Sequence, residues 1–61
     1  MKKEFKNKNL IARITESHNK FNVRILQISK TGLEIVEDLV TLKTGISTFN
    51  RAEKFALKQI A

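Results

Sequence analysis

The stretch GISTFNRAEKFA, from Gly45 to Ala56, contains a helix start shortly after a glycine, and it decides the fold expected for the chain. Thr48 and Asn50 are both residue types that cap helices, because their side-chain oxygens accept hydrogen bonds from the free N–H groups of the first turn. On a helical wheel the apolar side chains of this segment share one arc: Phe49, Ala52, Phe55, Ala56 and Ile60. The spacing predicts a C-terminal helix that packs across a sheet.

The segments before this helix have the two-residue period of strands. Apolar and polar residues alternate strictly from Phe21 to Ile25, and residues 10–15 also suit a strand. The polar cluster from Ser17 to Lys20 lies between them, which predicts a β-hairpin. Residues 1–9 hold four lysines without periodicity, so we expect a flexible basic arm followed by a single small domain at 10–61.

Residues 33–43 fit two interpretations. On a helical wheel their apolar side chains fill one half and their acidic side chains lie on the other, and Thr31-x-x-Glu34 has the spacing of a capping box, which predicts an amphipathic helix. The turn residue Gly32 and the β-branched residues after it favour a return strand instead. The strand interpretation gives the fold that we expect: a small α+β domain in which a three-stranded antiparallel sheet is packed by the C-terminal helix.

Composition restricts the compartment and the partners. Twelve Lys and Arg residues stand against six Asp and Glu residues, and such a positive balance favours nucleic acid as partner, then an acidic protein surface, then anionic lipid. No apolar run approaches the length of a membrane span, so we expect no membrane association. The absence of cysteine excludes disulfides and thiolate zinc sites and fits a cytoplasmic protein.

No group of residues has the spacing of a catalytic, metal or cofactor site. His18 is the only histidine and lies in a turn, whereas a metal site needs three or four converging ligands. The serines have no base near them in sequence, and Gly32 and Gly45 lack the spacing of a phosphate loop. The sequence therefore predicts that the protein is not an enzyme and binds no cofactor or metal.

The basic residues of the expected sheet predict a DNA-binding surface. Asn22 and Arg24 project from the same side of one strand, and their side chains are suited to adenine and guanine edges. Lysines at the turns would then lie close to phosphate groups. The predicted DNA-binding set is Arg13, Lys20, Asn22, Arg24, Lys30 and Lys43.

Three motifs resemble a known family. The motifs are Lys20-Phe21-Asn22-Val23-Arg24-Ile25, Lys30-Thr31-Gly32 and Gly45-x-x-Thr48-x-x-x-Ala52-Glu53-x-Phe55-Ala56. Together they resemble the three-stranded-sheet-plus-helix domains with which phage and transposon tyrosine recombinases bind arm-type DNA sites. The resemblance covers residues 20–58 and implies that the sheet enters the major groove with Asn22, Arg24 and Lys30. The chain departs from that family in the acidic residues Glu34, Glu37 and Asp38, where the family has a basic strand.

The helical interpretation of residues 33–43 leads to a second resemblance, to ribbon-helix-helix repressors. That resemblance implies a homodimer that places Asn and Arg side chains of a paired strand in the major groove. Both resemblances imply a small DNA-binding regulator of the phage or mobile-element type. The alternative function is a compact protein-binding inhibitor of the phage type, which Lys and Arg side chains steer to an acidic surface of a host protein.

Overall fold

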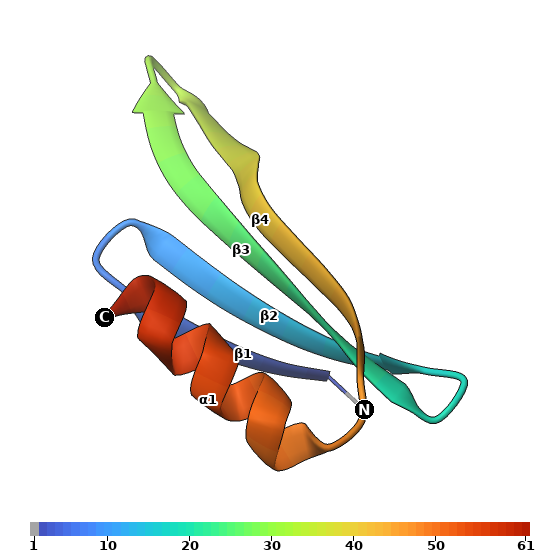
Figure 1. The fold of residues 1–61 in the computed structure, drawn as a ribbon. Helices are drawn as coiled ribbons and strands as arrows, with labels where there is room; N and C mark the ends of the chain where they lie inside the picture. The colour runs from blue at the N-terminus through green and yellow to red at the C-terminus, as the bar shows by residue number, and fades with distance from the viewer. Residues whose placement is uncertain (1) are drawn as a thin grey trace.

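The computed structural model describes residues 2–61 as four strands followed by one helix. The elements are β1 (Lys2–Asn7), β2 (Leu10–Ser17), β3 (Lys20–Thr31), β4 (Glu34–Ile46) and α1 (Phe49–Ile60). The strands form one antiparallel sheet in the order β1-β2-β3-β4, and α1 crosses one face of it (Figure 1). We call the face against α1 the covered face and the opposite one the open face.

The expected three-stranded sheet is wrong in its number of strands, because the sheet has four. The additional strand is β1, in the segment where the sequence suggested a basic arm. Its residues pair with β2 from Lys2 opposite Thr15 to Asn7 opposite Leu10. Phe5 packs against the core and is the one large apolar side chain that β1 contributes, which explains why this strand has no visible alternation.

The helical interpretation of residues 33–43 is also wrong, and the ribbon-helix-helix arrangement is excluded with it. Residues 34–46 form β4, which pairs with β3 along the length of both strands. The pair Thr31–Glu34 closes this hairpin and leaves Gly32 and Leu33 as its two-residue turn. Gly32 has a φ of +63°, a conformation that glycine adopts without the strain of a side chain, so the local turn and the long-range pairing both select a strand.

The turn predicted between residues 17 and 20 is confirmed. His18 and Asn19 connect β2 to β3, and both have a positive φ, of 52° and 62°. Two successive residues in this conformation form the hairpin turn whose twist matches that of the strands.

Two β-bulges interrupt the pairing of β4 with β3. Ile25 pairs with Thr41 whereas the next residue, Leu26, pairs with Leu39, so Val40 is an extra residue in β4. A second shift lies between the pairs of Phe21 and Val23. Because a bulge adds one residue to one strand, it changes which side chains of that strand share a face. Consequently Leu39 and Leu42 both lie on the open face.

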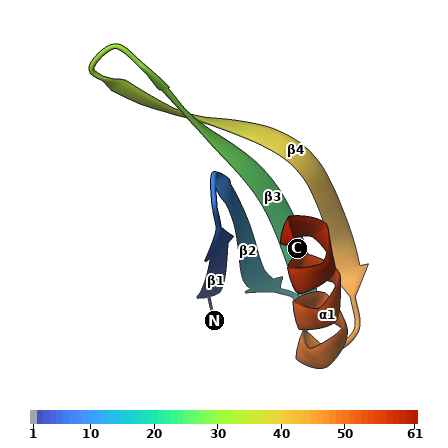
Figure 2. The ribbon, with the colours of Figure 1, turned by 90° about the vertical axis from the view of Figure 1, so that its left-hand side faces the viewer.

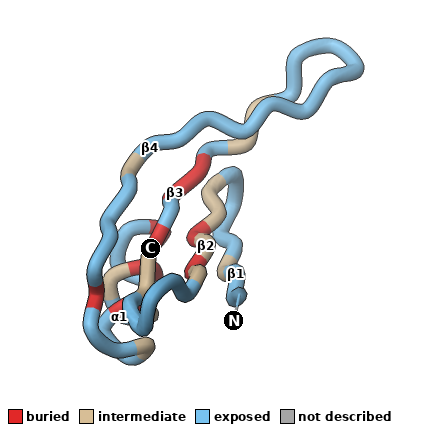
Figure 3. Tube along the Cα trace, turned by 90° about the vertical axis from the view of Figure 1, so that its right-hand side faces the viewer, coloured by how far each residue is buried: buried red, intermediate tan, exposed pale blue. Residues whose placement is uncertain are grey.

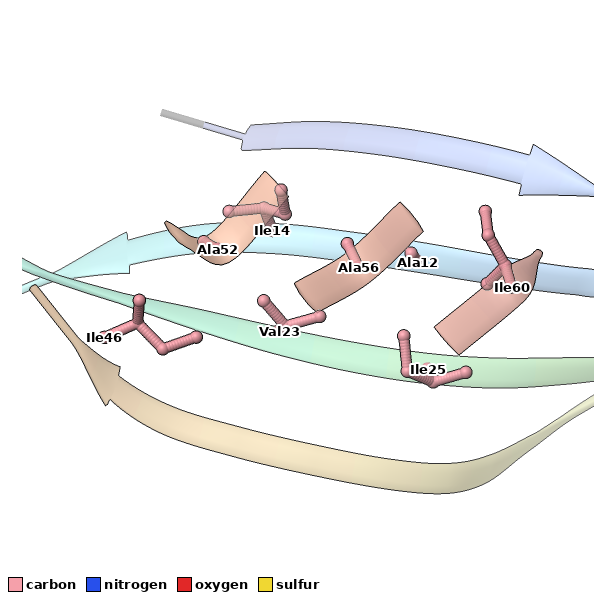
Figure 4. Close-up of a cluster of buried hydrophobic side chains, with 8 residues drawn as sticks. All are labelled: Ala12, Ile14, Val23, Ile25, Ile46, Ala52, Ala56 and Ile60. Atoms are coloured by element: carbon pink, nitrogen blue, oxygen red, sulfur yellow. The ribbon is translucent and has the colours of Figure 1, made fainter. Parts of the chain in front are cut away.

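The core lies between α1 and the covered face of the sheet (Figure 4). Ile14 and Val23 are paired on adjacent strands, and both are almost completely buried. Ala52 and Ala56 face them from the helix and are fully buried, and their small side chains let the helix lie close to the sheet. The buried cluster consists of Ala12, Ile14, Val23, Ile25, Ile46, Ala52, Ala56 and Ile60.

Polar contacts fix both ends of the helix. Thr48, one of the two candidate caps in the sequence, is the N-cap, and its hydroxyl oxygen accepts a hydrogen bond from the Arg51 N–H at 3.3 Å. At the other end, the side-chain amide of Asn7 donates to the carbonyl oxygen of Ile60 at 2.5 Å. The second contact ties the last turn of the helix to β1.

The β3–β4 hairpin is longer than the other strands and projects past them (Figure 2). The last residues of β3 that pair with β2 are Leu26 and Gln27, so the end of the hairpin is only two strands wide. Most of this projecting part is exposed to solvent (Figure 3).

Candidate nucleic-acid interface

The open face of the sheet gathers most of the cations that the sequence analysis selected. Arg13 in β2 pairs directly with Arg24 in β3, and alternation along β3 places Lys20, Asn22 and Lys30 on the same side. The register of β1 adds Lys2 and Lys6 to this face. Its charged residues are the cations Lys2, Lys6, Arg13, Lys20, Arg24 and Lys30 and the carboxylates Glu4 and Glu37.

Lys43 does not belong to this surface. It pairs with Val23, a residue of the core, so its side chain lies on the covered face. There its ammonium group lies 4.8 Å from the ring centroid of Phe55, within the range of a cation–π contact. Five of the six predicted residues therefore share a face, and Lys43 lines a hollow beside the start of the helix together with Arg51.

Arg13 is held by acidic neighbours. Its guanidinium forms a hydrogen-bonded ion pair with Glu4 on β1, and a second nitrogen lies 3.6 Å from a carboxylate oxygen of Glu37 on β4. The hydrogen bond from Arg13 lowers the pKa of Glu4, and the same hydrogen bond raises the pKa of Arg13. Arg13 is thus the least available of the open-face cations for an external anion.

Asn22 and Arg24 differ in how much of each side chain is available. The side-chain oxygen of Asn22 accepts a hydrogen bond from the Gly45 N–H at 3.4 Å, near the limit of a hydrogen bond, so its amide nitrogen is the group left to donate. Arg24 is exposed, and among residues 2–61 no ion pair with it is found. Arg24 is therefore the most accessible arginine of this face.

Sequence reasoning missed two kinds of residue on the open face. Lys2 and Lys6 belong to it because β1 is a strand, and the lack of alternation in β1 concealed this. Apolar side chains were missed as well, since Ile11, Leu26 and Leu39 form a row across β2, β3 and β4. Leu42 lies directly opposite Arg24 on β4. The open face therefore combines cations with a strip of apolar side chains.

All four phenylalanines lie on the covered side of the molecule. Phe5 and Phe21 pair with the core residues Ala12 and Ile46, and all four pack against the core. Phe21 and Phe49 form an edge-to-face pair with ring centroids 5.9 Å apart. The open face consequently offers no aromatic ring on which an unpaired base could stack.

Other kinds of site find no support in the described part of the chain. Residues 2–61 contain no group of three or more His, Cys, Asp or Glu side chains placed to hold a metal ion. Within the same residues, no helix has the length and apolar character that crossing a membrane requires.

Comparisons with known proteins find no matching family model, no matching curated protein and no matching solved structure.

Proposed function

We propose that the protein binds duplex DNA through the open face of its sheet. The observation that carries this proposal is the gathering of six cations against two carboxylates on one face, from three different strands. Lysine and arginine side chains that neutralise phosphates release counterions, and this supplies much of the affinity of proteins for DNA. Of the three acidic residues in the first half of β4, only Glu37 lies on the open face, because Glu34 and Asp38 pair with Thr31 and Gln27 on the covered face.

Within this proposal, some residues of the open face contact bases and others contact phosphates. Arg24 is the residue for a guanine edge, because it is exposed and lacks an ion-pair partner among the described residues. Asn22 lies two residues away on the same face, and its amide nitrogen donates to a base or phosphate oxygen. Lys2 and Lys20 lie near Asn22, Lys30 lies six residues beyond Arg24 along β3, and all three contact phosphates. Neighbouring strands are about 4.8 Å apart, so two strands with their side chains fit a major groove about 12 Å wide.

The covered position of the aromatic rings supports a duplex over a single strand. Proteins that bind single strands stack bases on aromatic side chains, with about 1–3 kcal/mol for each base. Here the rings of Phe5, Phe21, Phe49 and Phe55 pack against the core. A basic face without rings suits a target whose bases stay stacked and whose phosphates are regularly spaced.

The test compares two arginines on opposite sides of the molecule. Arg24→Ala removes a cation from the open face, and Arg51→Ala removes the same group from the exposed start of α1. Fluorescence anisotropy with a labelled duplex at low salt should show that Arg24→Ala costs about 1–3 kcal/mol of binding, whereas Arg51→Ala costs much less. A salt titration should give a steep linear fall of log affinity against log salt.

Three outcomes would contradict the proposal. One is equal loss of affinity in the two variants, which would mean that general charge and not the open face holds the duplex. Another is the absence of duplex binding at low ionic strength. The third is binding that favours single strands of the same length, which would exclude the assignment of duplex DNA as the target.

A second candidate function is binding to an acidic surface of another protein, as an inhibitor does. It is favoured by the apolar strip, because Leu39 and Leu42 are about half exposed beside Arg24. Protein interfaces commonly combine apolar side chains with arginine. Under this alternative, a pull-down from host lysate returns one protein, and Leu42→Ser weakens its capture. Under the DNA proposal, Leu42→Ser leaves duplex affinity close to that of the wild type.

A further inference from the structure

The two edges of the sheet differ in how they resist pairing with another strand. β1 has six residues, and three of them are lysines. Short length and lysine are the features by which natural proteins keep an edge strand from pairing with another chain. β4 has thirteen residues, no proline, and no lysine before Lys43. The two bulges of β4 are another protective feature, but β4 has neither the short length nor the lysines of β1, so its longer edge is the less protected one.

The less protected edge also exposes large apolar side chains. Ile35 is 66% exposed, Leu39 and Val40 are each 55% exposed, and Leu42 is 49% exposed. All four lie on β4, whose outer backbone edge has no partner strand among the described residues. A row of apolar side chains beside a free backbone edge is typical of a surface that another strand covers.

We propose that this edge pairs with β4 of a second copy of the chain, antiparallel and about a twofold axis. The distribution of charge along β4 selects this occupant. Its first half carries Glu34, Glu37 and Asp38, and the second half carries Lys43. An antiparallel twofold arrangement places the acidic half of each strand across from the basic half of the other, whereas a parallel arrangement places like charges together.

The bulge at Val40 fixes the register of this pairing. Residues directly opposite each other in an antiparallel pair point to the same face of the sheet. Leu39 pairs with Leu26 and Leu42 pairs with Arg24, so both leucines lie on the open face. Before the bulge the odd-numbered residues of β4 lie on the open face, and directly after it the even-numbered residue Leu42 does. A register that keeps the open faces of the two copies on the same side therefore pairs an odd-numbered residue before the bulge of one copy with an even-numbered residue after the bulge of the other.

One of these registers also matches the chemistry of the side chains. It places Leu39 opposite Leu42 of the second copy on the open face. On the covered face it places Asp38 opposite Lys43 of the second copy. Both contacts occur twice because of the twofold axis. Cross-strand pairs of apolar or opposite charges contribute about 0.2–1 kcal/mol each, so this register gains from both kinds of pair.

The dimer extends the sheet across both copies and keeps their open faces on the same side. It also suits the size of the chain, since a domain of about 60 residues buries only about 60% of the surface that its unfolded chain exposes, less than a larger domain does, and gains from association. The inference does not depend on DNA binding. Failure of either proposal leaves the other standing, because the dimer uses the edge of β4 and the proposed DNA contact uses the face of β1 to β3.

The test is a charge reversal read by mass and sedimentation on the full chain. The wild type should sediment as twice its 7.0 kDa at high micromolar concentration. Asp38→Lys and Lys43→Asp each create two like-charge pairs, and each alone should weaken the dimer about tenfold or more. A mixture of the two variants should recover the dimer. In the mixed dimer one copy has lysine at both positions 38 and 43 and the other has aspartate at both, so each of the two pairs across the axis again joins opposite charges.

Three results would overturn the inference. The first is a wild-type chain that stays monomeric at all accessible concentrations. The second is a dimer whose strength the reversals leave unchanged. The third is a mixture that dissociates as readily as either variant alone. Circular dichroism and urea unfolding of each variant identify any loss of folding, because both positions are exposed but Lys43→Asp also removes the contact of Lys43 with the Phe55 ring.

Cysteine pairing tests the register without altering charge. The chain has no cysteine, so Leu39→Cys and Leu42→Cys introduce single thiols. When mixed and mildly oxidised, these two variants should form a mixed disulfide about tenfold faster than Leu39→Cys forms one with Leu57→Cys, whose thiol lies on the exposed side of α1. Equal rates for the two mixtures would exclude the proposed register.

Discussion

Replacing Ile14 by alanine should remove a large part of the stability of this protein. Ile14 is 1% exposed and lies between the sheet and α1, where it pairs with Val23 on the adjacent strand. Each methylene taken from the core costs about 0.8 kcal/mol of transfer free energy, about 2.4 kcal/mol in all. The cavity that remains brings the total to about 3–4 kcal/mol. A chain of this length has a free energy of unfolding of about 3–9 kcal/mol, so the variant loses from a third to all of it.

The matched control is Ile35→Ala, the same substitution in another strand of the same sheet. Ile35 is 66% exposed on the projecting hairpin, so its replacement creates no enclosed cavity and should cost less than about 1 kcal/mol. Urea unfolding at low micromolar concentration, followed by circular dichroism, measures both. With a slope of about 1 kcal/mol per molar urea, Ile14→Ala should lower the midpoint by about 3 M or abolish folding.

Ile14→Val keeps the measurement possible if the alanine variant does not fold, and it should cost about 0.5–1.5 kcal/mol. Equal shifts of the urea midpoint for Ile14→Ala and Ile35→Ala would refute the reasoning. They would mean that α1 does not cover Ile14 in solution, or that the projecting hairpin is packed against another part of the chain.

Other predictions concern the helix cap, a turn and an ion pair. Thr48→Ala removes the acceptor for the Arg51 N–H and should lower the free energy of unfolding by about 1 kcal/mol, measured by urea unfolding. Gly45→Ala should cost about 1–2 kcal/mol in the same assay, because Gly45 has a φ of +71° and a β carbon there meets no atom within 4 Å, so backbone strain is the whole cost. The pKa of Glu4, measured by NMR, should lie below 4.5 and should rise toward 4.5 in Arg13→Gln. The ion pair of Glu4 with Arg13 should stabilise the fold above about pH 4.5, and this stabilisation should be lost as the pH falls through the lowered pKa of Glu4.

The parts of the fold that the sequence predicts are those in which local chemistry and long-range packing agree. The helix that follows Thr48 has its cap and its apolar arc, and the hairpin around His18 has strict alternation on one side and turn residues between its strands. β1 has neither feature, because Phe5 is its one large apolar residue. It is a strand because β2 offers an edge with which it can pair. This pairing depends on the tertiary structure, so the sequence of β1 alone does not predict it.

The residues of the candidate site also fall into those that local sequence predicts and those that only the pairing of strands brings together. Asn22 and Arg24 share a face because β3 has no bulge between them, so their relation follows from alternation alone. Lys2 and Lys6 join that face through a pairing that their own sequence does not indicate. Local pattern therefore predicts how residues of one strand are arranged, whereas the composition of the whole face depends on which strands are neighbours.

The bulge in β4 explains both why residues 33–43 resemble a helix and why Lys43 lies apart from the other predicted cations. In a regular strand the side chains of one face recur every second residue. Ile35 and Leu39 share the open face at a regular interval of four, and the extra residue Val40 shifts the period so that Leu42 joins them after an interval of three. Those intervals are the spacing of an apolar stripe on a helix. The same shift moves Lys43 from the open face to the covered face, where it meets Phe55. A single inserted residue thus produces a helical pattern in a strand and withdraws one cation from the surface that we propose for DNA.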